Sequence, residues 1–259
     1  MRLRFWKLSG AGNDFVLLRG LPAGRSGPAL ARRLCDRRSG IGADGLLSIS
    51  RHGRMVHLDY WNADGSPAFC GNGSRCAALW AKAMGWTKGN RFVLGTNRGA
   101  LSARFTGKGR ADVVMPDPHG LRLGLRLKVS GRTQTVHFVH TGVPHAVLFV
   151  PDVEKIDVRT LGRALRFHKA FGKAGANVDF VSVKSGSLIL RTYERGVEDE
   201  TLACGTGVMA AGFVACVLGK TRPSTQVSVR SGAKLNVSFL DGARLEGQGK
   251  IVYTGEVVL

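Results

Sequence analysis

Two cysteine-centred segments contain the residues of this sequence whose types and spacing could do chemistry. Residues 70–85 read CGNGSRCAALWAKAMG, and residues 204–219 read CGTGVMAAGFVACVLG. The segments align without a gap, share Cys-Gly-x-Gly, continue into small apolar residues and close on a glycine. We expect each to form a buried helix that begins just after its cysteine, Cys70 or Cys204.

The position of these thiols suggests what each turn could do. A cysteine at a helix N-terminus lies at the positive end of the helix dipole, which lowers the pKa of the thiol and favours the thiolate. The glycines leave backbone N–H groups accessible, so a carboxylate could bind there with the sulfur beside its α-carbon. One such turn would suit a nucleophilic cysteine enzyme or a redox thiol. Two turns facing one cavity would place a sulfur on each face of the same carbon and could invert it.

The repeat also bears on domain organisation. With 259 residues, 44% hydrophobic and 7% aromatic, the chain can form one large globular domain or two of ordinary size. Two similar segments separated by half the chain predict two related domains that contribute equivalent elements. Five cysteines, an odd number, do not suggest a disulfide framework. We therefore expect Cys35, Cys76 and Cys216 to be buried, inert thiols.

The net charge of +20 is spread along the chain rather than clustered. The densest patch, ARRLCDRRSG at 31–40, is interrupted by an aspartate, and the sequence has no zinc-finger spacing or basic tail. We expect a solvated surface that attracts anionic metabolites and binds no nucleic acid. No apolar run approaches the roughly 20 residues of a membrane span, and the N-terminus lacks a signal-peptide pattern. These features predict a cytoplasmic protein with no membrane contact.

Short runs of alternating apolar residues between Gly, Asp and Asn predict many strands, with hairpins around 185–186 and at 232. Few helices are expected: about 28–38, about 159–171 and the two after the cysteines. The pattern indicates a mostly antiparallel sheet wrapped around a few buried helices. No pyridoxal-type lysine, dinucleotide fingerprint or metal motif is present, so we expect no cofactor and no metal.

Seven motifs occur in the order seen in diaminopimelate epimerases, and the resemblance covers almost the whole chain. It implies a cofactor-independent isomerase that interconverts LL- and meso-diaminopimelate for lysine and peptidoglycan precursor synthesis, and a homodimer. It also implies an α/β fold of the α+β type with two pseudo-symmetric domains, residues 1–115 plus 249–259 and residues 116–248. Each domain would be a mostly antiparallel sheet or barrel around a central helix. The motifs are KLSGAGNDFVLL (7–18), GIGADGLL (40–47), NADGSPAFCGNGSRCAA (62–78), TGVPHAV (141–147), GANVDFV (175–181), YERGVEDETLACGTG (193–207) and YTGEVV (253–258).

The resemblance further implies a role for individual residues. Cys70 and Cys204 would be the acid/base pair, and His145 and Glu194 would tune the thiols. Arg195 would make a bidentate contact with the distal substrate carboxylate. The full set implied to bind substrate is Asn13, Asn62, Gly71, Asn72, Asn177, Glu194, Arg195, Gly205 and Thr206.

Two departures from the family pattern concern substrate recognition. Some members have Asn where this chain has Val143, and some have Gln where it has Gly45. We interpret Asp44, in GIGADG, as part of a structural turn. A racemase of the same fold that acts on another amino acid is the alternative. A basic nucleic-acid-binding module and a dithiol redox protein are minor alternatives from another class.

Overall fold

The computed structural model describes residues 1–53, 55–96 and 99–259, which fold into two compact units. The first unit is Met1–Val114 together with Glu246–Leu259, and the second is Met115–Leu245. The chain therefore returns to the first unit at its C-terminal end. The domain bounds expected from the sequence, at 115 and 249, lie close to these positions.

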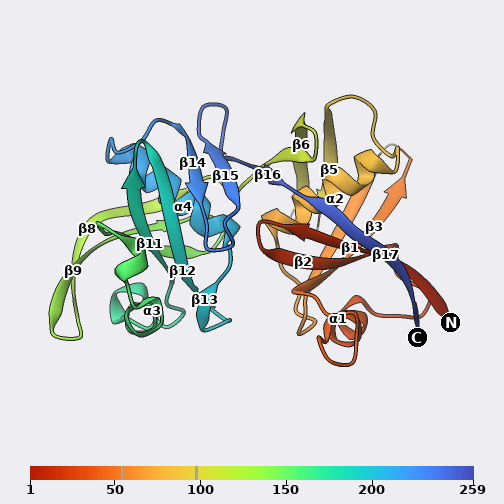
Figure 1. Ribbon diagram of the computed structural model, residues 1–259, viewed down its shortest axis with the longest axis horizontal. Coiled ribbons are helices and arrows are strands. Elements are labelled where there is room, and N and C mark those ends of the chain that lie inside the picture. The colour runs from red at the N-terminus through yellow and green to blue at the C-terminus, as the bar shows by residue number, and fades with distance from the viewer. Residues whose placement is uncertain (54, 97–98) are drawn as a thin grey trace. The chain divides into compact units, whose positions relative to one another are not determined.

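The first unit is a sheet that curves around one helix, α2 (Figure 1). That helix packs against β1, β2, β3, β4, β6, β7 and β17, while α1 covers β2, β3 and β4. The bounds are β1 Arg2–Gly10, β2 Asn13–Arg19, α1 Gly27–Cys35, β3 Gly45–His52, β4 Met55–Asn62, α2 Gly71–Ala83, β5 Arg91–Thr96, β6 Gly99–Gly107, β7 Arg110–Val114 and β17 Lys250–Val258. The strand β16, Arg244–Gln248, begins in the second unit and ends in the first, because the boundary falls between Leu245 and Glu246.

The second unit repeats this arrangement around α4 (Figure 1). That helix packs against β9, β10, β11, β12, β14 and β15, while α3 lies against β8, β11, β12 and β13. The bounds are β8 His119–Val129, β9 Arg132–His140, β10 Pro144–Phe149, η1 Val153–Lys155, α3 Val158–Arg166, η2 Lys169–Phe171, β11 Asn177–Lys184, β12 Ser187–Glu194, β13 Asp199–Thr201, α4 Gly205–Val217, β14 Ser224–Ser228 and β15 Lys234–Ser238.

The strand pairing has the same order in both units. In the first, β1–β2 is antiparallel, β2–β3 parallel, β3–β4 antiparallel, β4–β5 parallel and β5–β6 antiparallel. In the second, the same alternation runs through β9, β10, β11, β12, β14 and β15. In each unit a helix lies between the strands of each parallel pair, α1 and α2 in the first and α3 and α4 in the second. The similarity seen in two cysteine segments thus extends to the pairing of six strands in each unit.

The matching ladders allow residues to be paired between the units. The β2–β3 ladder begins at Phe15 and Gly45, and the β10–β11 ladder begins at His145 and Asn177. Two residues further on, Leu47 pairs with Leu17 and Asp179 with Val147. Phe15 therefore corresponds to His145, and Leu47 corresponds to Asp179.

The predicted α+β fold class is confirmed, and so are the two hairpins. Ser185 and Gly186 have φ of 49° and 76°, as a two-residue turn with both φ positive requires. Gly232, at φ 80°, lies between β14 and β15. The helix expected at 159–171 is divided into α3 and the short turn η2. Cys35 and Cys76 are buried as predicted, but Cys216 is only half-buried because it lies in the last turn of α4, where Val217 is exposed.

Candidate active site

Cys70 caps the N-terminus of α2, as the sequence predicted. Its backbone is extended, with φ −132° and ψ 107°, and its Sγ accepts the Gly73 N–H at 3.4 Å. A Cβ at Gly73 would lie 3.1 Å from the Leu47 side chain. The glycine therefore allows α2 to approach β3 closely. The thiol is half-buried at the positive end of a helix whose first turn contains no acidic residue.

Cys204 occupies the corresponding position on α4 but has different surroundings. Its Sγ lies 3.3 Å from Thr206 Oγ1, and the residue is buried. Burial raises the pKa of Cys204 well above its usual value, the negative charges of Glu194 and Asp179 raise it further, and the Thr206 hydroxyl and Gly207 N–H only partly oppose this. The pKa of Cys204 is thus raised, contrary to the expectation that this turn favours a thiolate, because burial and two carboxylates disfavour the charged form.

A chain of hydrogen bonds connects Cys204 to a buried carboxylate. Thr206 Oγ1 lies 2.9 Å from His145 Nε2, and His145 Nδ1 lies 2.6 Å from Asp179 Oδ2. The Thr192 hydroxyl donates to the other Asp179 oxygen at 2.7 Å. His145 and Asp179 are both fully buried. Sequence reasoning identified His145 and Thr206 but missed Asp179, although a carboxylate in the apolar run VDFVSV is an unusual residue to bury.

In the first unit, a second chain of hydrogen bonds orients two of the predicted substrate-binding amides. Arg75 Nη2 donates to Asn72 Oδ1, Asn72 Nδ2 to Asn13 Oδ1, and Asn13 Nδ2 to Asp44 Oδ2, at 2.7, 2.7 and 2.9 Å. Arginine can only donate and a carboxylate can only accept, so the two ends of the chain fix the orientation of both amides. Each amide keeps one further N–H available. Asp44, expected to be only a turn residue, therefore also positions Asn13, and Arg75 was missed.

Asn62 is the last residue of β4, where it donates to Ser66 Oγ at 3.0 Å and accepts from the Tyr60 hydroxyl at 2.9 Å. A side chain at Gly45 would meet Tyr60 Cε2 at 2.5 Å and its hydroxyl at 2.7 Å. The tyrosine therefore occupies the space that a glutamine at position 45 would need.

The remaining predicted residues lie at the end of β12 and beside it. Asn177 is buried; its Nδ2 donates to the Pro144 carbonyl, and its Oδ1 accepts the Arg195 N–H at 2.9 Å. Asn177 thus holds the backbone that carries Arg195. Glu194 accepts the Thr201 hydroxyl at 2.8 Å.

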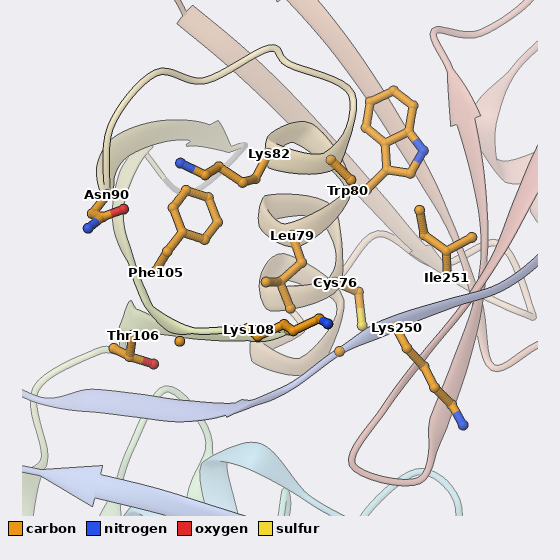
Figure 2. Close-up of a pocket in the computed structure, with 14 residues that line it drawn as sticks. Cys76, Leu79, Trp80, Lys82, Asn90, Phe105, Thr106, Lys108, Lys250 and Ile251 are labelled. Carbon is orange, nitrogen blue, oxygen red and sulfur yellow. The ribbon is translucent and has the colours of Figure 1, made fainter.

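A separate cavity of about 590 Å³ lies beside α2, and none of the predicted site residues lines it (Figure 2). Cys76 does line it, between Lys250 and the helix. Burial raises the pKa of Cys76 to about 12. Cys76 is therefore a protonated thiol that lines this cavity, and we assign it no acid/base role beside Cys70.

Among the residues that the structure describes, no group of three or more His, Cys, Asp or Glu side chains could hold a metal ion. Within the same ranges, no helix is both long enough and apolar enough to cross a membrane.

Comparison with known proteins places the chain in a family. The sequence model for diaminopimelate epimerase matches residues 5–119 and 137–259. The diaminopimelate epimerase of Aquifex aeolicus is 39% identical over 98% of this chain and 95% of its own. That of Chlorobaculum tepidum is 39% identical over 97% of this chain and 100% of its own.

Solved structures support the same fold. A Bacillus anthracis phenazine biosynthesis protein of the PhzF family has a TM-score of 0.78 at 11% identity, with full coverage of both chains. A probable proline racemase from Agrobacterium radiobacter K84 has a TM-score of 0.72 at 15% identity, covering 99% of this chain and 93% of its own. At these identities the likeness concerns the fold alone. The family match and the relatives that align over nearly their full length show more than the fold. This chain belongs to the diaminopimelate epimerase family.

Proposed function

We propose that this chain interconverts LL- and meso-diaminopimelate, with Cys70 and Cys204 as the two acid/base groups. The observation that carries the proposal is the duplication: each unit has a cysteine at the N-terminus of its central helix, followed by the same Gly-x-Gly pattern. The membership of the family supports diaminopimelate as the substrate. In the reaction, one sulfur removes the α-proton and the other delivers a proton to the opposite face, so the centre inverts.

The helix termini supply the stabilisation that this weak carbon acid needs. In the proposal, the N–H groups of Gly71, Asn72, Gly205 and Thr206 bind the carboxylate at the reacting carbon. Both helix dipoles then favour the negative charge that develops when the proton leaves. No cofactor is required in this scheme.

The far end of the substrate needs partners of its own. We propose that Arg195 binds the distal carboxylate, because its guanidinium makes no ion pair or hydrogen bond with the described residues while its backbone is fixed by Asn177. Asn13 and Asn62 would complete the site. Asn13 is suited to this role because its orientation is set by Asp44 and Asn72.

We also propose that the protein is a cytoplasmic homodimer that serves lysine and peptidoglycan precursor synthesis. Sedimentation equilibrium of the full chain tests the dimer, and a single species of 27.7 kDa would contradict it.

The test of the function is incubation with LL-diaminopimelate in deuterated water, followed by chiral separation and mass analysis. We expect meso-diaminopimelate that carries deuterium at the inverted carbon. Cys70→Ala and Cys204→Ala should each abolish inversion, whereas Cys216→Ala, a matched variant on α4, should retain it. Near-normal inversion by either single variant would contradict the two-base mechanism. Efficient racemisation of alanine or proline, with no turnover of diaminopimelate, would instead favour another amino-acid substrate.

A further inference from the structure

The environment of Cys204 raises a question that the two-base scheme leaves open. The thiol is buried, and Glu194 and Asp179 both disfavour its negative charge. A thiolate at this position therefore needs a nearby group that takes the proton and becomes positively charged. The hydrogen-bonded chain through Thr206 ends at such a group, the imidazole of His145.

We propose that Thr206 and His145 relay the proton of Cys204, and that Asp179 is a positioning residue that holds the imidazole and stabilises its charged form. This role rests on the proposed function, in which Cys204 acts as a base. In the step, the S–H bond of Cys204 breaks and its proton passes to Thr206 Oγ1. At the same time the hydroxyl proton of Thr206 passes to His145 Nε2. The products are a thiolate and an imidazolium, and the reverse step restores the thiol.

The hydrogen bonds set the direction of this relay. The Asp179 carboxylate can only accept, so the Nδ1 atom that lies 2.6 Å away carries a proton. Asn177 Nδ2 can only donate, and it lies 3.5 Å from Nε2. In the neutral imidazole Nε2 is therefore the acceptor, so the Thr206 hydroxyl donates to it. That leaves Thr206 Oγ1 free to accept the Cys204 thiol proton at 3.3 Å.

The duplicated fold argues against a purely structural role for these polar residues. In the first unit the corresponding positions are Phe15 for His145 and Leu47 for Asp179, and both are fully buried. The two central helices confirm this correspondence, since a Cβ at Gly73 would approach Leu47 and a Cβ at Gly207 would approach Asp179, at 2.6 Å. An apolar pair is enough to build this part of the fold. Burying a carboxylate and an imidazole instead costs free energy unless the two groups are paired and hydrogen-bonded, so the fold alone gives no reason for this polar pair.

Among the described residues, Glu194 and His140 are further titratable groups near the relay. Glu194 acts on Cys204, and His140 lies near His145 on the neighbouring strand β9. Burial first, and then the neighbouring His119, His145 and Arg195, lower the pKa of His140, so His140 is neutral near pH 8. Of these neighbours, Asp179 alone contacts the imidazole of His145 through a carboxylate.

The test measures the alkylation rate of Cys204 by iodoacetamide at pH 8, with peptide mapping and no substrate. Asp179→Asn and Thr206→Val keep the size of each side chain, so access to the sulfur should be little changed. We expect each to slow alkylation of Cys204 at least about tenfold, the equivalent of one pKa unit. Thr206→Ser should react like the wild type. Cys70 in the same molecules should keep its rate and serves as the internal control.

The sign of the Asp179→Asn effect decides between two physical roles. If Asp179 acted only through its field on the sulfur, removing its charge would speed alkylation of Cys204, and that result would overturn the relay. Equal rates for Thr206→Val and Thr206→Ser would overturn it as well, even if Asp179→Asn failed to fold. Asp112→Asn, another buried aspartate paired with an arginine, should leave Cys204 unchanged. Because no diaminopimelate is used, the outcome is independent of whether the chain epimerises that substrate.

Discussion

Gly212→Ala should show how tightly α4, and with it Cys204, is held against the sheet. A Cβ at position 212 would lie 2.4 Å from Val237 Cγ2, more than 1 Å inside the normal carbon–carbon separation of roughly 3.5–4.0 Å. Val237 is fully buried, and its branched side chain has little rotamer freedom. Such overpacking costs about 1–3 kcal/mol, and an overlap of this size lies at the upper end. The better helix propensity of alanine returns up to about 1 kcal/mol.

The net expectation for Gly212→Ala is therefore a loss of about 2 kcal/mol in the free energy of unfolding. Urea unfolding measures it as a lower midpoint with an unchanged m-value. Val237→Ala alone should also destabilise because it leaves a cavity, which the new methyl group at position 212 would partly fill. The double variant should then lose at least about 1 kcal/mol less than the sum of the single losses. Additive losses, or a Gly212→Ala variant as stable as the wild type, would refute the reasoning.

Three further predictions concern charge and sulfur chemistry. Because burial raises the pKa of Cys35 and Cys76 from 9.0 to about 12 in the folded state, their contribution to stability is complete below pH 9 and is lost as the pH rises toward 12. Urea unfolding should show that the free energy of unfolding falls by up to about 1.4 kcal/mol per pH unit for each thiol. This pH dependence should be weaker in Cys76→Ala, which has lost one of the two thiols. Arg195→Met should weaken diaminopimelate binding by a few kcal/mol, measured by calorimetry, since a buried carboxylate would lose its charged partner. Mild oxidation should join Cys70 and Cys204, with reversible loss of activity; a dominant bridge through another cysteine would contradict the proposal that the two thiols act on one substrate.

Features encoded locally could be predicted from the sequence. The two Cys-Gly-x-Gly turns, their helices and the two hairpins depend on residues a few positions apart, and local rules cover them. The rest of the fold and the candidate site residues were predicted from the resemblance to a known family that the seven motifs carry. Asn72 and Thr206 lie two residues after their cysteines, so their place at the helix N-termini needed no tertiary information.

Features that depend on strand pairing could not be predicted. Asp179 meets His145 because β10 and β11 are parallel neighbours, although the two residues lie 34 positions apart. Asp44 reaches Asn13 across 31 positions in the same way. The raised pKa of Cys204 could not be predicted either, because the sequence shows a helix N-terminus but neither the burial of the thiol nor the carboxylates that lie near it in the fold.

The two units share a fold but surround their sulfurs with opposite charge. Arg75, fully buried on α2, interacts electrostatically with Cys76 and Cys70, and it corresponds to the apolar Met209 on α4. Cys204 instead has carboxylates near it and an imidazole within reach through Thr206. In the proposed reaction one sulfur must be a thiolate while the other is a thiol, and two identical half-sites would have no means of distinguishing them. Duplication explains why there are two thiols on two helices. In the proposed scheme, the differences between Arg75 and Met209 and between Phe15 and His145 give the two thiols different electrostatic surroundings.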